Sequence, residues 1–336
     1  MRIFFCLIFV CVVISVSAQD RKFINSQLKF SLEYLPESKI KGDSGTNTFQ
    51  YSKAQVGFVL PVLSRRFALS NDLKYRTFLV LANAHAAYAL SDYSFLQKKH
   101  QLLNAVAGPS VIYNSGNKNT YIAGMTAGIA QDINSFDNAA IRLTGHAVFK
   151  RKINGNFSFH LGAVYTYAFA RPMLLPLAGC VIRTSSKSKL KISLPLSISF
   201  LYKTNEFDML TLFIQPDGEQ FTFSASGEPV FASYDPQLLR MRYRSFKTGL
   251  NYKIGFGGKV FFTPEAGISF KRRIAFADGP PGEKSSFYKA DVKTCPYIKV
   301  ALRILLGDLR WKRNGENFLM NDERLDYNDI DYPAKH

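Results

Sequence analysis

Charged side chains recur at alternate positions along many segments of this chain, the spacing that places side chains on one face of a β-strand. Most are Lys or Arg, and few Asp or Glu balance them. A ring of basic groups around a passage selects anions, whereas basic groups paired with carboxylates fill an interior. The side chains that we expect to line such an interior are Lys29, Glu33, Lys53, Arg142, Lys191, Lys247, Glu265, Lys271, Arg273, Asp291, Lys293, Lys299 and Arg303.

Two interpretations of this basic row remain open. In the first, it surrounds an anion-preferring pore or cavity, to which Lys191, Lys271 and Lys299 contribute. In the second, many of the lysines lie at strand ends and face lipid phosphate, while the inner ones pair with carboxylates. Pairing would place Glu33 beside Asp291 and leave an excess of positive charge.

The residue types needed for hydrolysis are present but are not grouped. A hydrolase that cuts lipid needs a Ser and a His in contact, with a third group to orient the His. His146 and Ser158 lie on neighbouring predicted strands, but both fall in inward-facing rows and no third member is placed beside them. The 5 histidines show no i, i+2 or i, i+4 spacing, so no metal site is indicated. We therefore expect no catalytic residue, no cofactor and no enzyme activity.

The first 18 residues have the form of a secretory signal peptide. A basic residue, Arg2, precedes an apolar run over residues 3–16, and small residues at 16–18 provide a cleavage site. No other segment has the roughly 18 uninterrupted apolar residues of a spanning helix. The predicted organisation is a signal peptide over residues 1–18, one β-barrel over 19–306 and a periplasmic tail over 307–336.

Two of the 4 cysteines, Cys6 and Cys11, fall in the predicted leader. Cys180 and Cys295 remain, each inside a predicted strand and neither in a C-x-x-C pair. An oxidising compartment permits a disulfide between them, but lone strand cysteines more often serve as small buried side chains.

Apolar and polar residues alternate over unusually long segments. In residues 259–276 one row holds Val260, Phe262, Pro264, Ala266, Ile268, Phe270, Ile274 and Phe276, and the other holds Lys259, Thr263, Glu265, Gly267, Ser269, Lys271 and Arg273. Soluble strands average only about 5–6 residues. Because the pattern recurs along the chain behind a secretory leader, it predicts an all-β, antiparallel transmembrane β-barrel of the outer membrane, with the apolar row toward lipid.

The alternating segments predict about fourteen strands, and twelve if weak segments are merged. The even count depends on a turn at residues 216–219, Pro-Asp-Gly-Glu, whereas residues 189–203 are expected to form one strand. A secreted β-sandwich adhesin is the soluble alternative, and it would have shorter strands with aromatic side chains buried between two sheets.

The charge balance restricts the partners. The chain carries 43 Lys and Arg against 25 Asp and Glu, a net charge of +18. An exported protein does not routinely meet nucleic acid, so we expect no nucleic-acid partner. The expected counterparts are outer-membrane lipid and lipopolysaccharide, together with a small anionic solute.

Four segments of alternating residues are distinctive. They are F-S-L-E-Y-L-P at residues 30–36, Q-V-G-F-V-L-P-V-L at 55–63, K-L-K-I-S-L-P-L-S-I at 189–198 and E-A-G-I-S-F-K-R-R at 265–273. They resemble a family of uncharacterised outer-membrane β-barrel proteins, classified as a domain of unknown function. The resemblance covers nearly the whole chain after the leader. It implies the barrel fold and the bacterial outer membrane, and it assigns no catalytic or ligand-binding residue.

We therefore expect an outer-membrane protein that acts as a passive channel or small-solute transporter, with a preference for anions, or as a structural membrane component. A lipid-modifying outer-membrane hydrolase is the alternative from another class. A His/Ser/Asp cluster at one rim of the barrel would favour the enzyme, and an open basic lumen would favour the channel.

Overall fold

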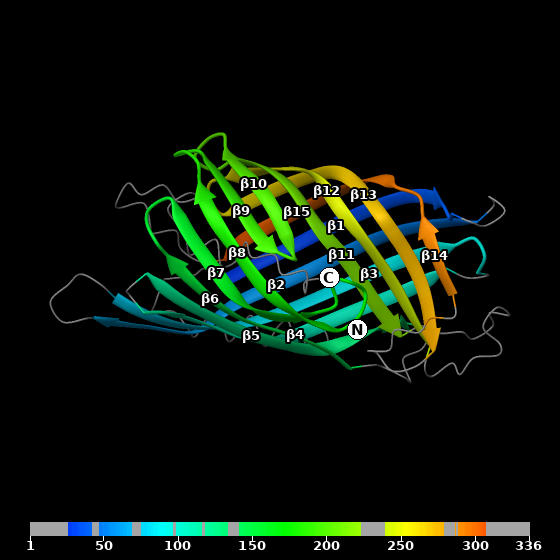
Figure 1. Cartoon of the computed structure of the whole chain (residues 1–336), viewed down its shortest axis with the longest axis horizontal. Coiled ribbons are helices and arrows are strands. Elements are labelled where there is room, and N and C mark those ends of the chain that lie inside the picture. The colour runs from blue at the N-terminus through cyan, green and yellow to red at the C-terminus, as the bar shows by residue number, and fades with distance from the viewer. Residues whose placement is uncertain are drawn as a thin grey trace.

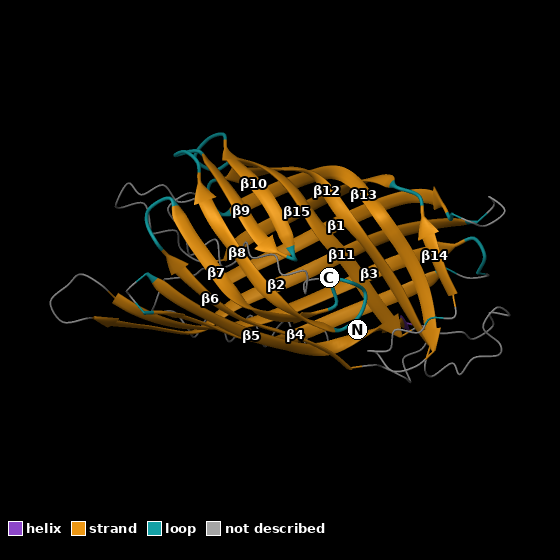
Figure 2. Cartoon of the chain, viewed as in Figure 1, coloured by secondary structure: helices purple, strands orange, loops and turns teal. Residues whose placement is uncertain are grey.

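The computed structural model describes residues 26–41, 47–68, 75–96, 99–115, 118–133, 141–222, 239–278, 286 and 288–306 (Figure 1). The predicted signal peptide at 1–18 and the predicted tail at 307–336 lie outside the described residues. Strands make up most of the described chain (Figure 2). None of the helical structure in these ranges is both long enough and apolar enough to cross a membrane.

One antiparallel sheet closes on itself to form the barrel. Neighbouring strands pair in chain order, β1 pairs with β15, and β12 pairs with β13. Since β14 and β15 both pair with β13, they form one interrupted strand, and the wall has fourteen strands, as predicted. The strands are β1 (Ser26–Lys39), β2 (Thr48–Ala68), β3 (Tyr75–Tyr93), β4 (His100–Asn114), β5 (Asn119–Asp132), β6 (Ile141–Lys152), β7 (Phe157–Thr166), β8 (Met173–Arg183), β9 (Ser188–Leu194), β10 (Ser197–Lys203), β11 (Met209–Thr222), β12 (Leu239–Phe256), β13 (Val260–Asp278), β14 (Tyr288–Val292) and β15 (Cys295–Leu306).

The outer face of the wall is apolar. Alternate residues of β1 and β15, such as Leu32 and Ile298, are each 60% exposed, and the residues between them point into the lumen. A closed antiparallel wall with an apolar outer face is the fold of an outer-membrane β-barrel, and the alternation predicted for these strands is confirmed.

The predicted turn at residues 216–219 is wrong. Strand β11 runs straight through it, paired with β12 from Met209 to Thr222. Asp217 and Glu219 belong to the inward row, where each forms an ion pair with a lysine of another strand. Gly218 lies between them on the opposite face, and a Cβ built there would lie 2.4 Å from the Ala168 carbonyl oxygen. The glycine thus permits a close backbone approach and does not form a turn.

The predicted single strand at residues 189–203 is also wrong, because the chain reverses within it. Strands β9 and β10 pair with each other, with Ser193 opposite Ser197. That register keeps odd-numbered residues on the inside of both strands, so the alternation continues through the turn unchanged. Within the turn, Leu196 is an exception among the even-numbered residues, because its side chain is buried inside the lumen and does not face lipid. This extra reversal offsets the missing turn at 216–219, which is why the total count is right.

The short β9–β10 hairpin leaves a seam in the wall. Each of its strands has 7 residues, and β9 pairs only with the Ala178–Arg183 part of β8. The remainder of β8 and the end of β11 therefore have no strand between them. The backbone of residues 168–170 packs against β11 at Gly218, and Thr222 at the end of β11 pairs with Gln131 of β5, so these contacts close the seam.

A bulge in β13 exchanges the two faces of that strand. Lys271 has a positive φ of 48°, and the pairing with β12 shifts between Arg244 and Phe246. Beyond the bulge, Arg272, Ile274 and Phe276 point inward and are at most 1% exposed. The sequence prediction placed Ile274 and Phe276 toward lipid, which is wrong because one extra residue reverses the facing of every residue after it.

Deleting Lys271 tests this bulge. Because Lys271 is the extra residue, its deletion lets β13 pair regularly with β12 while Arg272, Ile274 and Phe276 still point inward, so we expect the folded, heat-modifiable form on gels to be kept. Deleting Arg273, beyond the bulge, turns Ile274 and Phe276 outward and should abolish that form. Lys271→Gly keeps the bulge and relieves the positive φ, so it should leave stability unchanged or raise it by up to about 1 kcal/mol. A Lys271 deletion variant that fails to fold, or an Arg273 deletion variant that folds as well as wild type, would contradict the assignment of Lys271 as the extra residue.

Candidate functional site

A cavity of about 350 Å³ occupies one half of the lumen. On β1 it is lined by Gln27, Lys29 and Ser31, but not by residues later in that strand. On β15 its lining includes Lys299 and Arg303 near the end of the strand. The cavity therefore lies toward the end of the barrel where β1 begins and β15 ends, which we call the terminal end. The opposite end is the loop end.

Basic side chains dominate the charge of the cavity lining. The lining residues include one carboxylate, Glu265, and six basic side chains, which are Lys29, Lys150, Lys191, Lys253, Lys299 and Arg303. The ring of Phe261 holds two of these cations in place, with Lys253 Nζ 5.6 Å and Arg303 Cζ 5.5 Å from its centroid. Glu265 accepts a hydrogen bond from the Tyr297 hydroxyl at 3.0 Å. The excess of cations gives the cavity a positive potential.

An apolar cluster borders the same cavity on other strands. Its members come from β3 to β8 and from the turn after β9, and they are Leu79, Leu81, Ile112, Ile122, Val148, Val164, Leu177 and Leu196. Six of the eight also appear in the cavity lining. We call this cluster the apolar wall. Because barrel lumens are usually polar, it is an unusual feature.

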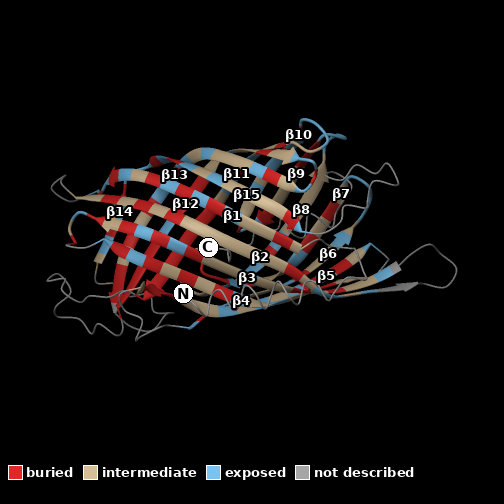
Figure 3. Cartoon of the chain, turned by 180° about the vertical axis from the view of Figure 1, so that it is seen from behind, coloured by how far each residue is buried: buried red, intermediate tan, exposed pale blue. Residues whose placement is uncertain are grey.

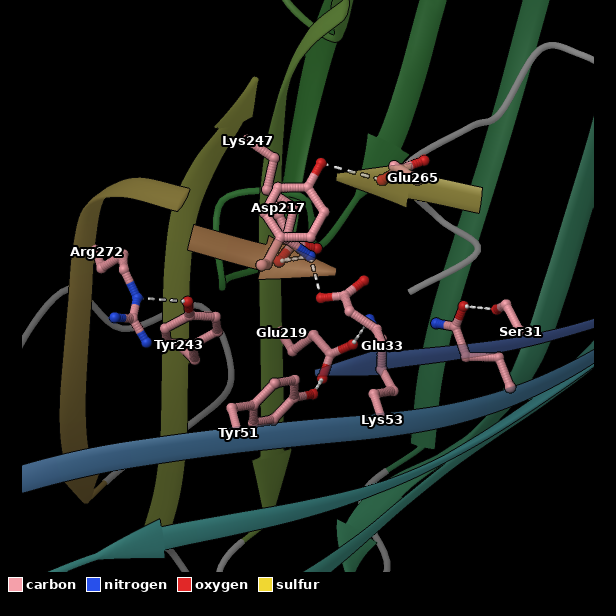
Figure 4. A network of polar contacts seen from close by, with 12 residues as sticks. Ser31, Glu33, Tyr51, Lys53, Asp217, Glu219, Tyr243, Lys247, Glu265 and Arg272 are labelled. Carbon is pink, nitrogen blue, oxygen red and sulfur yellow. Dashed lines mark hydrogen bonds and ion pairs between the residues drawn. The ribbon is translucent and has the colours of Figure 1, made fainter. Parts of the chain in front are cut away.

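Buried ion pairs cross the lumen beyond the cavity (Figure 4). Lys247 of β12 binds Glu33 of β1 and, at 2.9 Å, the Asp217 carboxylate of β11. Lys53 of β2 binds Glu219 of β11 at 2.9 Å, and every side chain in these pairs is at most 3% exposed. We call these five residues the charged layer.

Neighbouring groups complete the charged layer. The Tyr51 hydroxyl donates a hydrogen bond to Glu219, and Lys247 lies 5.3 Å from the ring centroid of Tyr297. Lys299 interacts electrostatically with Glu33 and Asp217 from the cavity side. A buried charge needs a partner of opposite sign, and Lys53, Lys247 and Lys299 together supply one to each carboxylate of the layer.

Beyond the charged layer, side chains fill the lumen at the loop end, where Figure 3 shows buried residues on β12, β13 and β14. The Tyr93 and Phe276 rings meet at 5.6 Å, and the Tyr93 hydroxyl lies 2.8 Å from the Met241 sulfur, although β3 is not a neighbour of β12 or β13. We call this cluster the apolar plug, and its members are Leu35, Ile40, Phe49, Tyr51, Ala89, Tyr93, Leu96, Leu102, Ala130, Phe213, Phe221, Leu239, Met241, Tyr243, Ile274, Phe276, Ala290, Val292, Cys295 and Tyr297.

Arg272 is buried at the edge of this plug. Its Nε donates a hydrogen bond to the Tyr243 hydroxyl at 3.1 Å, and its Nη1 donates to the Lys293 carbonyl oxygen at 2.9 Å. The guanidinium also lies 5.5 Å from the Phe49 ring centroid. Arg272 thereby joins β12, β13 and β2 at the loop end.

The structure distributes the sequence-predicted residues over three places. Lys29, Lys191, Glu265, Lys299 and Arg303 line the cavity, and Glu33, Lys53 and Lys247 form the charged layer. Arg142 is buried, with its guanidinium 4.3 Å from the Tyr167 ring centroid, and it acts electrostatically on Glu219.

Four of the predicted residues lie elsewhere, and their predicted facing is wrong. Lys271 and Lys293 are exposed, and Arg273 and Asp291 form an ion pair at 2.6 Å on the outer face. The bulge in β13 explains why Lys271 and Arg273 do not point into the lumen, since it exchanges the inward and outward faces of the strand at that point. Asp291 lies between Ala290 and Val292, which are buried in the apolar plug. It therefore pairs with Arg273 and not with Glu33.

Sequence reasoning missed Asp217, Glu219 and Arg272. A signal for the first two was present, because they continue the odd-numbered inward row of Phe213 and Gln215. Arg272 carried no such signal, since its inward position depends on the extra residue at the bulge.

The predicted Ser/His pair does not form. His146 lies opposite Val164, and Ser158 lies opposite Lys152, so the register separates them. His160 instead contacts Ser193, at 3.1 Å, in the cavity lining. The hydrogen bonds of His160 within the described chain include none to a carboxylate that would orient it as a catalytic base. The described residues also contain no group of three or more His, Cys, Asp or Glu that could hold a metal ion, and Cys180 and Cys295 are free thiols.

The wall, the lipid-facing band and the filled lumen define this protein as an outer-membrane β-barrel by fold. A family model described as a domain of unknown function (DUF6268) matches residues 22–305, so the chain belongs to that family. The resemblance noted in the sequence is thus confirmed. A search of curated proteins gave no significant match.

Solved structures of low sequence identity align with most of this chain. The COG4313 outer membrane channel from Pseudomonas putida F1 is 6% identical, with a TM-score of 0.39 over 85% of this chain and 97% of that chain. The translocator domain of the autotransporter NalP from Neisseria meningitidis is 7% identical, with a TM-score of 0.36 over 86% and 91% of the two chains. LpxR from Salmonella typhimurium is 8% identical, with a TM-score of 0.32 over 83% and 100%.

The charged layer makes a direct stability prediction. Lys247→Met leaves Glu33 and Asp217 buried without their shared cation, so the free energy of unfolding should fall by about 3–5 kcal/mol. Urea titration in detergent, followed by heat-modifiable gel mobility, measures the change. Adding Glu33→Gln to Lys247→Met should restore part of the loss. The control Lys293→Met, at an exposed site, should change stability by less than about 0.5 kcal/mol.

Proposed function

We propose that this protein is an outer-membrane channel for small anionic solutes, non-enzymatic, with the terminal end toward the periplasm. The observation that carries the proposal is the lumen cavity, where six basic side chains and one carboxylate contribute to the lining. Cations around a lumen lower the energy of an anion and raise that of a cation. Of the other described charges of the lumen, Glu33, Asp217 and Glu219 pair with Lys53 and Lys247 in the charged layer, whereas Arg142 and Arg272 are buried against aromatic rings away from the cavity lining.

The apolar plug is the barrier to passage in this proposal. An anion that enters the cavity meets the charged layer and then tightly packed aromatic side chains. Transport therefore requires the plug to move, and the protein works as a closed channel that opens. Outer-membrane lipid and lipopolysaccharide are the proposed surroundings of the apolar outer face. If the plug never opens, the remaining role is that of a structural membrane component.

Truncating the plug should open a conducting path. Tyr93→Ala combined with Phe276→Ala removes two rings that meet across the lumen, and we expect single-channel conductance in planar bilayers to rise well above that of wild type. Phe30→Ala combined with Tyr34→Ala, on the lipid-facing row of β1, is the matched control and should leave conductance unchanged. An unchanged conductance in the folded plug variant would argue against a channel.

Ion selectivity tests the basic lining. In the plug-truncated protein, the reversal potential under a KCl gradient should show chloride favoured over potassium. Lys191→Glu places a carboxylate in the lining and should lower the chloride-to-potassium permeability ratio by on the order of twofold or more. Lys271→Glu makes the same charge change at an exposed site on the bulge and should not alter the ratio. A preference for potassium in the parent protein would refute the proposal.

A further inference from the structure

Basic and aliphatic side chains are unevenly distributed around the lumen cavity. Lys253, Arg303, Lys299 and Lys29 come from β12, β15 and β1, which with β13 are consecutive in the wall. We call these four residues the basic arc. The apolar wall comes from β3 to β8 and the turn after β9, and the other two basic residues of the lining, Lys150 and Lys191, come from β6 and β9 on that side. Since the two groups of strands occupy opposite parts of the fourteen-strand ring, the basic arc and the apolar wall face each other across the cavity.

A site for inorganic anions alone does not account for the apolar wall. A small hydrated anion gains nothing from aliphatic side chains, because it would lose hydration without a compensating hydrogen bond. Leu81, Ile122 and Val148 contribute to the cavity lining together with the basic arc. An aliphatic surface favours a ligand with an apolar part, at about 25 cal/mol per Å² of area removed from water.

We propose that the cavity binds an amphipathic monoanion, a carboxylate that carries a medium-length acyl chain, with its head group at the basic arc and its chain along the apolar wall. This inference rests on the proposed function and names the solute class of the same cavity. A volume of about 350 Å³ lies within the range of about 300–1,000 Å³ typical of small-molecule sites. Arg303 and Lys253, both placed against the Phe261 ring, supply the donors for the carboxylate.

The test uses octanoate as the probe and the full barrel in lipid nanodiscs, with empty nanodiscs to subtract partitioning into lipid. Equilibrium dialysis should show saturable binding to one site. Acetate, which lacks the chain, should need at least 100-fold higher concentration to compete, and octanol, which lacks the charge, should not compete. Competition by octanol equal to that of octanoate would overturn the head-group assignment and hence the proposal.

Variants separate the two sides of the site. Arg303→Gln with Lys253→Gln should weaken octanoate binding at least tenfold, whereas Lys293→Gln, at an exposed position, should not change it. Ile122→Thr with Val148→Thr should weaken octanoate binding about fivefold or more and leave the chloride preference of the plug-truncated protein intact. Ala301→Phe fills the cavity without removing a charge and should abolish binding. Each variant is first checked for heat-modifiable gel mobility.

The outcomes distinguish this inference from the proposed function. If acetate competes as well as octanoate while chloride is preferred over potassium, the cavity is a simple anion site and the acyl-chain assignment fails. If octanoate binds but the opened pore prefers potassium, the channel proposal fails and the binding site stands. If Ile122→Thr with Val148→Thr folds and binds octanoate as wild type does, the apolar wall does not contact the ligand and the inference fails.

Discussion

The interior of this barrel depends on the neutralisation of charges that the wall buries. Lys247 lies between Glu33 and Asp217, and Lys53 contacts Glu219, so lysines of β2 and β12 bind carboxylates of β1 and β11. An unpaired ion in this environment would cost several kcal/mol. The pairs form only when all four strands are in the correct register, because a shift of one residue would turn each charge toward lipid. The ion pairs therefore fix how the two ends of the sheet meet at closure.

The arrangement along the lumen follows from where charge is balanced. The charged layer has carboxylates and lysines in nearly equal number, so it seals the middle of the lumen without a strong field. Toward the loop end, aromatic and aliphatic side chains pack to exclude water. Toward the terminal end, the basic residues of the lining exceed its single carboxylate, and that imbalance coincides with the cavity. The charges that border open space in the lumen are thus mostly basic, whereas Arg142 and Arg272 are enclosed by packed side chains.

The sequence predicted the barrel, its strand number and the lipid-facing rows, because alternation is a local property that lipid contact imposes on each strand. The prediction failed where one extra residue exchanges the inward and outward faces of a strand, and where a turn leaves the alternation of faces unbroken. The extra residue at Lys271 exchanged the faces of β13, and the hairpin at Leu196 kept the alternation intact. The partners of Glu33 could not be predicted either, since they come from distant strands that the curvature of the wall brings together. The sequence identified the basic side chains as a group. Whether each one lies in the cavity or in the charged layer depends on its position along the barrel axis, which the alternation of residues does not indicate.

The seam beside the β9–β10 hairpin has a consequence for how the wall responds to stress. Over most of its circumference, a continuous ladder of backbone hydrogen bonds holds each strand to the next, as along the 21 residues of β2. Between the start of β8 and the end of β11 that ladder is missing, and packing of residues 168–170 at Gly218 and a single pair between Thr222 and Gln131 of β5 take its place. These few contacts hold the wall together less strongly than a continuous ladder of hydrogen bonds does. Thermal fluctuations or lateral pressure from the bilayer will therefore separate the wall first along this line, and any side passage between the lumen and the lipid would open there.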